Sequence, residues 1–233
     1  MKQILFLMFF LFSVHCWGQI ADKETYLNDF KEKLKKECPQ ARPLFVVFHG
    51  HSVPAGYSVA PEVETFRAYP QLFLYGLKAQ YPTSVVSVIT TSIGGEDSQQ
   101  GAKRFENEVL VHRPDVLFID YGLNDRRLGV ERSEAAWRKM IEAALQKGIK
   151  VMLMTPTPDQ RVDILDGKTS LERQAALIRK LAAEYHVGLI DSYALFREKI
   201  KQGNVLKKYM SGINHPNILG HMCVTSEILP WFY

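Results

Sequence analysis

The chain has 233 residues, of which 46% are hydrophobic and 23% are charged, and its formal net charge is +4. This length and composition are typical of one soluble globular domain with a sizeable core. Lysine and arginine are spread along the chain and form no cluster, so the sequence shows no pattern of nucleic-acid binding.

The N-terminal segment has the pattern of a secretory signal peptide. Lys2 precedes an apolar run at residues 4–12, and the small residue Gly18 follows. This is the order of the basic, apolar and cleavage regions in such peptides, and the run is too short to span a bilayer comfortably. We expect residues 1–18 to be removed, which leaves one secreted or periplasmic domain at residues 19–233 without stable membrane insertion.

The three cysteines leave two alternatives open. Lipidation at Cys16 is a less favoured route to export, because His15 fits poorly before a lipid-modified cysteine. After removal of the signal peptide, Cys38 and Cys223 remain in an oxidising compartment. They form either one disulfide or two separate buried thiols, since sequence does not define the distance between their Cα atoms.

Apolar runs and amphipathic segments alternate along the remaining chain. The predicted strands are the apolar runs at residues 44–49, 85–89, 116–120, 150–154 and 187–190. The predicted helices are residues 22–37, 63–80, 98–112, 132–147, 170–185, 191–202 and 217–229. Continuous apolar strands that alternate with helices predict a parallel sheet covered on both faces. We expect an α/β fold, a flavodoxin-like three-layer α/β/α sandwich with the strand order 2-1-3-4-5.

Three turns in this scheme carry residues that can take part in catalysis. Ser52 follows the first predicted strand, Gly94 and Gly95 follow the second, and Asn124 follows the third. Ligands of open α/β sheets bind at the carboxyl ends of the strands, near the point where the strand order reverses. The sequence therefore predicts that these residues meet at one edge of the sheet.

Ser52 is the candidate nucleophile of this edge. A serine hydroxyl is a weak nucleophile and needs a base, and histidine exchanges protons near neutral pH. His215 lies in a turn just before the last predicted helix, from which it can reach over the sheet edge. The backbone N–H groups of Ser52 and Gly95 and the side-chain amide of Asn124 are candidate donors to an oxyanion.

These four positions resemble the SGNH family of hydrolases, also called GDSL esterases, which is named for its Ser, Gly, Asn and His blocks. The corresponding segments are residues 50–56, 92–101, 122–125 and 215–217, in the order of the family. The resemblance implies a carboxylic ester hydrolase that acts through an acyl-enzyme and needs no cofactor and no metal. It implies that Ser52 is the nucleophile, that His215 is the base, and that Ser52, Gly95 and Asn124 form the oxyanion hole.

Two positions depart from the family pattern. His51 precedes the serine, where the family usually has Asp. Gly212 stands three residues before His215, where the acid of the family's triad usually lies. Two possibilities follow: a Ser-His dyad in which a backbone carbonyl near Ser211 orients the imidazole, or an acid that is distant in sequence.

The substrate class is inferred from export and from polar loops. Both favour removal of short acyl groups, such as acetyl, from carbohydrate, so that the partner is a small-molecule or glycan ester substrate. Lipid or aryl esters are the alternative within the family, and a non-catalytic carbohydrate-binding relative of the fold is the alternative outside it. The candidate substrate contacts are His51, Tyr57, Tyr121 and Arg126.

His49 and His51 raise a third alternative, a metal-dependent hydrolase. Asp120 at the end of a neighbouring strand is the nearest additional ligand, but no third ligand has convincing spacing. We therefore expect these two histidines to shape the pocket or to hydrogen-bond to the loops.

Overall fold

The computed structural model describes residues 18–233, and its centre is one sheet of five parallel strands in the order β2-β1-β3-β4-β5. The strands are β1 (Leu44–Gly50), β2 (Val86–Thr90), β3 (Val116–Asp120), β4 (Lys150–Met154) and β5 (Gly188–Ile190). Both the number of strands and their order confirm the fold that the sequence predicts.

The helices connect the strands in chain order. The α-helices are α1 (Asn28–Leu34), α2 (Ser52–Ala55), α3 (Tyr69–Gln80), α4 (Ser98–Glu108), α5 (Gly122–Asp125), α6 (Val130–Gln146), α7 (Ser170–Glu184), α8 (Ser192–Lys201) and α9 (Ile218–Ile228). The 3₁₀-helices are η1 (Thr65–Arg67), η2 (Leu110–His112), η3 (Leu206–Tyr209) and η4 (Leu229–Trp231).

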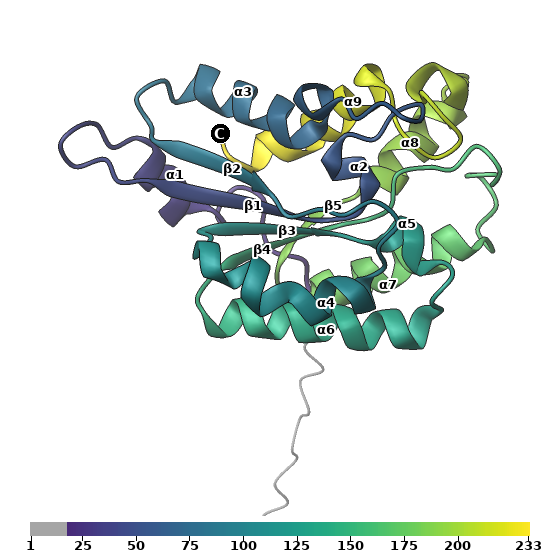
Figure 1. Cartoon of the computed structure of the whole chain (residues 1–233), viewed down its shortest axis with the longest axis horizontal. Coiled ribbons are helices and arrows are strands. Elements are labelled where there is room, and N and C mark those ends of the chain that lie inside the picture. Colours follow the sequence, from purple (N-terminus) through teal and green to yellow (C-terminus); the bar gives the residue numbers. More distant parts are fainter. Residues whose placement is uncertain (1–17) are drawn as a thin grey trace, which may run out of the picture.

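Two layers of helices cover the sheet, with α3, α8 and α9 on one face and α4, α6 and α7 on the other (Figure 1). Successive side chains of a strand point to opposite faces. Phe48 and Phe118 therefore belong to one buried cluster, whereas Leu117 and Val151 belong to the other. The strands are apolar at nearly every position because both faces are buried.

The register of the sheet brings the ends of β1 and β3 together. Gly50 pairs with Asp120, the last residue of each strand. The short helices α2 and α5 follow these ends directly, and Figure 1 shows both at the same end of the sheet. The turns that carry Ser52 and Asn124 are therefore neighbours through the strand register.

The helix expected at residues 63–80 is two elements. Ala68 has an extended backbone with φ −75° and ψ 149°, and it separates η1 from α3. Pro70 lies in the first turn of α3. The N–H that proline lacks has no hydrogen-bond partner at this position of a helix, so proline favours a helix start here. Phe66 consequently lies outside the buried face of α3 and is 86% exposed.

Other differences concern the ends of elements and short turns. The first helix begins at Asn28 rather than at residue 22, and α4 ends at Glu108 before the separate turn η2. The loop expected at residues 50–63 contains a single-turn helix at residues 52–55, and the turn expected at residues 122–125 is another. Single turns have no apolar periodicity, so their sequences do not distinguish them from loops.

The export and cysteine predictions meet the structure only in part. The expected signal peptide lies outside the described residues except for Gly18. None of the helices within residues 18–233 has the length and apolar character needed to cross a bilayer. Cys38 and Cys223 are free thiols, and Cys38 is exposed. Of the two alternatives, separate thiols describe the structure, although Cys38 is exposed and Cys223 is only partly buried.

Candidate active site

The candidate nucleophile begins a one-turn helix directly after β1. The backbone N–H of Val53 donates to Nδ1 of His51, which caps this helix, at 3.2 Å. A Cβ atom at Gly50 would lie 2.5 Å from the carbonyl oxygen of Asp120, so the close approach of β1 and β3 requires glycine there. These contacts fix the backbone at Ser52, whose side chain is largely buried.

The candidate base approaches from the turn between η3 and α9. Nε2 of His215 lies 3.0 Å from Oγ of Ser52. Ser211 Oγ donates to the carbonyl oxygens of His215 at 3.1 Å and of Pro216 at 3.3 Å, and Asn217 caps the N-terminus of α9. The structure thus brings together the two residues that the sequence singled out as nucleophile and base, although 163 positions separate them.

The second imidazole nitrogen of His215 contacts a backbone carbonyl. Nδ1 lies 3.1 Å from the carbonyl oxygen of Ser58, and no carboxylate of the described residues hydrogen-bonds to this ring. The expectation of a carbonyl near Ser211 is wrong in position, because the carbonyl that contacts Nδ1 belongs to Ser58, in the loop after α2. A Cβ atom at Gly212 would lie 3.9 Å from the Ser58 oxygen.

The environment of His215 favours its neutral form. Burial lowers the pKa of the imidazole below its ordinary value of 6.5, and the charge of the nearby His51 acts in the same direction. The hydrogen bond to the Ser58 carbonyl opposes these effects only in part. A neutral imidazole with its proton on Nδ1 leaves Nε2 free to accept the proton of Ser52.

Backbone and side-chain donors surround the nucleophile. Within residues 18–233, the N–H groups of Ser52 and Gly95 donate no hydrogen bond. Gly95 has φ 84°, a conformation that favours glycine, and a Cβ atom there would meet nothing within 4 Å. One amide hydrogen of Asn124 is used by the carbonyl of Glu96 at 2.8 Å, which leaves the second for an oxyanion.

A buried ion pair supports the turn that carries Gly95. Nε of Arg104 lies 3.0 Å from both carboxylate oxygens of Glu96, and a terminal nitrogen lies 2.6 Å from one of them. The same arginine donates to the carbonyl of Thr91 at 2.6 Å. Sequence reasoning missed this pair because the spacing from α4 back to its preceding loop has no local signature.

A buried carboxylate links the second and third blocks. Asp125 accepts from the N–H of Ser98 at 2.8 Å and from Nε1 of Trp137 at 2.7 Å. Burial raises the pKa of Asp125 to about 6, although these hydrogen bonds oppose the change. The residue after Asn124 therefore ties α5 to α4 and α6, which fixes the direction of the Asn124 side chain.

His51 lies beneath the nucleophile. Its side chain is 0% exposed, and Nε2 lies 3.5 Å from a carboxylate oxygen of Asp120. The other oxygen of Asp120 accepts from the hydroxyl of Tyr69 at 2.8 Å. The expected substrate contact at His51 is not available in this structure, because no part of its side chain reaches the surface.

His49 and Tyr121 form a second buried pair. Nδ1 of His49 lies 2.9 Å from the hydroxyl of Thr91, and Nε2 lies 3.1 Å from the hydroxyl of Tyr121. Burial, with the nearby charge of Arg104, lowers the pKa of His49 to about 3. Tyr121 is fully buried, so the substrate contact expected from it is likewise not available.

The two histidines near the nucleophile contact different partners and do not converge. Among residues 18–233, no group of three or more His, Cys, Asp or Glu side chains is close enough to hold a metal ion. His49 and His51 instead hydrogen-bond to loops or pair with a carboxylate. They have the structural roles that the sequence analysis proposed for them.

Tyr57 and Arg126 are the remaining candidate contacts. Tyr57 is 39% exposed, and its ring centroid lies 6.1 Å from that of His215. A Cβ atom at Gly94 would lie 2.7 Å from the Tyr57 ring, so this tyrosine lies against both the base and the turn before Gly95. Arg126 is mostly buried and pairs with Asp159 at 2.5 Å.

Comparison with known proteins decides the family. A model of the GDSL-like Lipase/Acylhydrolase family matches residues 48–223, which is most of the chain. The chain belongs to this family. The resemblance noted from its sequence blocks is confirmed, and this GDSL-like acylhydrolase is a carboxylic ester hydrolase.

Two curated relatives of this GDSL-like acylhydrolase are bacterial enzymes. The acetylxylan esterase of Geobacillus stearothermophilus is 24% identical over 167 residues, which cover 66% of this chain and 75% of the relative. Thioesterase 1/protease 1/lysophospholipase L1 of Escherichia coli (strain K12) is 29% identical over 143 residues, which cover 60% of this chain and 62% of the relative.

Solved structures share the fold of the GDSL-like acylhydrolase. The acetylxylan esterase Axe2 from Geobacillus stearothermophilus aligns with a TM-score of 0.71 and 21% identity over 81% of this chain and 94% of that one. A two-domain esterase active on acetylated mannans aligns with a TM-score of 0.73 and 19% identity over 92% of this chain and 54% of that one. These alignments support the three-layer sandwich.

Proposed function

We propose that this GDSL-like acylhydrolase is an exported serine esterase that removes short acyl groups, acetyl foremost, from carbohydrate through an acyl-enzyme. The observation that carries the proposal is the 3.0 Å contact between Ser52 Oγ and His215 Nε2, next to the unused N–H groups of Ser52 and Gly95. The relatives support the substrate class, since they include an acetylxylan esterase and an esterase active on acetylated mannans. Export rests on the N-terminal sequence pattern alone.

The first half-reaction forms the acyl-enzyme. Ser52 Oγ attacks the ester carbonyl while Nε2 of His215 accepts the hydroxyl proton. The carbonyl oxygen becomes an oxyanion, which accepts hydrogen bonds from the N–H groups of Ser52 and Gly95 and from the amide of Asn124. Collapse of this intermediate breaks the bond to the sugar oxygen, and His215 returns its proton to the departing alcohol.

The second half-reaction restores the serine. A water molecule gives a proton to Nε2 of His215 and attacks the acyl carbon, and the same three donors hold the new oxyanion. Ser52 Oγ then leaves and takes the proton back from the imidazolium, which releases the carboxylic acid. Each step uses the contact between Ser52 and His215 in one direction or the other.

The Ser58 carbonyl takes the place of the third member of a triad. It accepts the Nδ1 proton of His215 at 3.1 Å, which selects the tautomer with a free Nε2. A neutral carbonyl can orient the ring, but it stabilises the imidazolium less than a carboxylate does. The proposal is therefore a Ser-His dyad oriented by the backbone.

Hydrolysis of 4-nitrophenyl acetate by the purified protein and by Ser52→Ala tests the reaction class. We expect the substitution to abolish turnover, and a fluorophosphonate probe to add covalently to the wild-type serine but not to the variant. Equal rates, or no adduct, would contradict the role of Ser52 as nucleophile, and no turnover by either protein would favour a non-catalytic relative of the fold. Release of acetate from acetylated xylo-oligosaccharides by the wild type then tests the substrate class.

One observation favours a second candidate, an esterase for lipid or aryl esters. Exposed apolar side chains occur on the segments that carry Ser58, Gly95 and His215; they are Tyr57, Val59, Ile93 and Ile213. A series of 4-nitrophenyl esters with increasing chain length separates the two candidates. A rate that rises with chain length beyond acetate would favour the second candidate, and a rate that falls would favour the first.

A further inference from the structure

Two arginines share one buried carboxylate at the end of the sheet that holds the site. Arg126 donates to Asp159 at 2.5 Å, and Arg161 donates to it from its backbone N–H at 2.9 Å and from two guanidinium nitrogens at 2.9 Å and 2.6 Å. The Asp159 side chain is 0% exposed, whereas that of Arg161 is 56% exposed. A structural link between α5 and the loop after β4 would need only the first of these arginines.

Two connections link this arginine pair to the segments that carry candidate catalytic residues. Arg126 follows the candidate oxyanion donor Asn124 by two residues, at the end of α5. Gln160, between Asp159 and Arg161, donates from its backbone N–H to the carbonyl of Ile213 at 2.8 Å and from Nε2 to that of Gly212 at 2.7 Å. The loop that carries Asp159 and Arg161 is thus hydrogen-bonded to the turn that carries His215.

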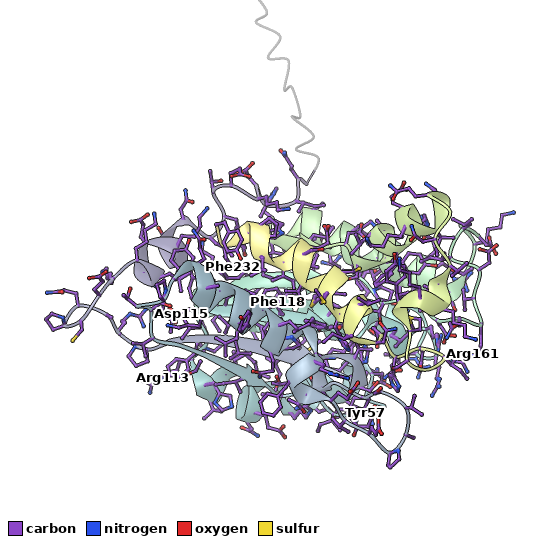
Figure 2. All side chains as sticks on the ribbon, turned by 90° about the horizontal axis from the view of Figure 1, so that it is seen from above. Tyr57, Arg113, Asp115, Phe118, Arg161 and Phe232 are labelled. Atoms are coloured by element: carbon purple, nitrogen blue, oxygen red, sulfur yellow. The ribbon has the colours of Figure 1, made fainter. Side chains whose placement is uncertain are left out.

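Figure 2 agrees with this placement. Figure 2 shows Tyr57, which packs near His215, and Arg161 toward the same end of the molecule. Arg113 and Asp115, which precede β3 at the opposite end of the sheet, lie toward the other end in the same view.

The cluster carries an uncompensated positive charge. Burial raises the pKa of Asp159, but hydrogen bonds from Arg161 and Arg126 outweigh this effect and lower the pKa to about 2, so the carboxylate is ionised at neutral pH. Two guanidinium groups against one carboxylate leave one positive charge. Among the described residues, Arg126 donates only through one terminal nitrogen, and one terminal nitrogen of Arg161 makes no hydrogen bond.

We propose that Arg126 and Arg161 bind the carboxylate of an acidic sugar, so that the preferred substrate is an acetylated glycan containing uronic acid. This inference rests on the proposed function, because it names the substrate class of the same site. A guanidinium presents several N–H donors in one plane, and this geometry matches the two oxygens of a carboxylate. A neutral sugar has no charged group that could pair with these arginines.

The test compares two synthetic trisaccharides that differ only in charge. One is acetylated trigalacturonic acid, and the other is the galactose trisaccharide with the same acetyl groups. We expect the wild type to have the higher kcat/KM on the acidic substrate. Arg161→Gln should lower that value about tenfold, the scale of one lost charge-assisted hydrogen bond. The same variant should lower the rates on the neutral trisaccharide and on 4-nitrophenyl acetate far less.

Two variants make the result specific to this position. Arg113→Gln removes the same charge from the opposite end of the sheet and should change neither trisaccharide rate. Arg161→Lys keeps the charge without the planar fork and should recover part of the loss. An increase in salt concentration should lower only the kcat/KM on the acidic trisaccharide, because salt screens the attraction between exposed charges.

Three results would overturn the proposal. The first is equal wild-type kcat/KM values on the two trisaccharides. The second is an unchanged kcat/KM of Arg161→Gln on the acidic trisaccharide. The third is a decrease of kcat/KM in that variant that is the same on all substrates and accompanies a lower Tm. The last result would make the pair a structural link only. Failure of the proposed function is distinct, because the wild type would then release acetate from neither trisaccharide in a Ser52-dependent way.

Discussion

The carbonyl oxygen of Ser58 lies 3.1 Å from Nδ1 of His215 and 3.9 Å from the position that a Cβ atom would occupy at Gly212. The usual acid of the family would extend from residue 212 into this space. Here the loop after α2 turns back through a bridge between Tyr57 and Val63 and brings a backbone carbonyl to the imidazole. The catalytic histidine is therefore oriented by an uncharged group.

An aspartate at residue 212, the usual position of the family's acid, should make His215 a stronger base. Gly212 is not one of the glycines with positive φ, so aspartate is compatible with its backbone. In Gly212→Asp the new carboxylate lies near Nδ1 of His215 and raises the pKa of the imidazole. The acidic limb of kcat/KM should move to higher pH by about one unit or more, the scale of an opposite charge within about 4–6 Å. The kcat value on 4-nitrophenyl acetate should rise, because a carboxylate stabilises the imidazolium.

The matched control for this change is Gly212→Asn, which has nearly the same shape and no charge. It should leave the acidic limb where it is in the wild type. If asparagine and aspartate shift the pH profile equally, the shift comes from the changed backbone at residue 212 and not from charge. The assignment of the Ser58 carbonyl as the orienting group would then lose its support.

The wild-type pH profile should itself show a base with a lowered pKa. Burial lowers the pKa of His215 below 6.5, and only the unprotonated imidazole can accept the Ser52 proton. Activity should therefore be fully present above pH 6.5 and should fall as the pH drops through the lowered pKa. The measurement is kcat/KM for 4-nitrophenyl acetate between pH 4 and 8, with Tm recorded at each pH. A midpoint above 6.5 with an intact fold would contradict the stated environment of His215.

Much of the fold could be predicted because each strand is a continuous apolar run. In β3, all five residues are buried, which is why the run has no alternation and why helices cover both faces. The strand ends then placed Ser52 and Asn124 at one edge. The boundaries of α3 were less predictable, because Phe66 continues the apolar spacing although the backbone at Ala68 leaves the helix.

The chemistry of the site was predictable only where it depends on side chains in short blocks. Ser52 and His215 come from separate blocks that follow predicted elements, so their meeting could be expected. The partner of Nδ1 could not, because a carbonyl exists at every residue and only the folded loop selects Ser58. The pairing of His51 with Asp120 also depends on strand register, which joins positions far apart in the sequence.

If the site is a Ser-His dyad, substitution of no single carboxylate should lower kcat as much as substitution of His215. His215→Ala should lower kcat about 10⁶-fold, the scale of removing the histidine base of a serine hydrolase. Substitution of any one Asp or Glu by its amide should lower kcat far less, because none of the described carboxylates hydrogen-bonds to the imidazole. The measurement is kcat on 4-nitrophenyl acetate for the set of variants.

Glu96→Gln and Asp120→Asn are the sharpest members of that set. Both carboxylates are buried near the nucleophile, and each supports a neighbouring group rather than the base. A variant whose loss equals that of His215→Ala, with an unchanged Tm, would identify a triad acid and end the dyad proposal.

The buried pair of His51 and Asp120 should make the usual family residue unfavourable in this chain. His51→Asp places a second carboxylate near the first, where the structure has an imidazole nitrogen at 3.5 Å. Two buried carboxylates cannot both ionise easily, so one acquires a raised pKa in the folded state. The variant should lose stability as the pH rises above about 4, because the folded state then holds a proton that the unfolded state releases.

A double variant completes this test through thermal unfolding. His51→Asp should lower Tm at pH 7 by several degrees, because one of two neighbouring buried carboxyl groups must then stay protonated. Adding Asp120→Asn removes one of the two like charges and should recover most of that loss, whereas Asp120→Asn alone should destabilise the wild type. Additive losses in the double variant would show that the two side chains do not interact, and the histidine before the nucleophile would then need another explanation.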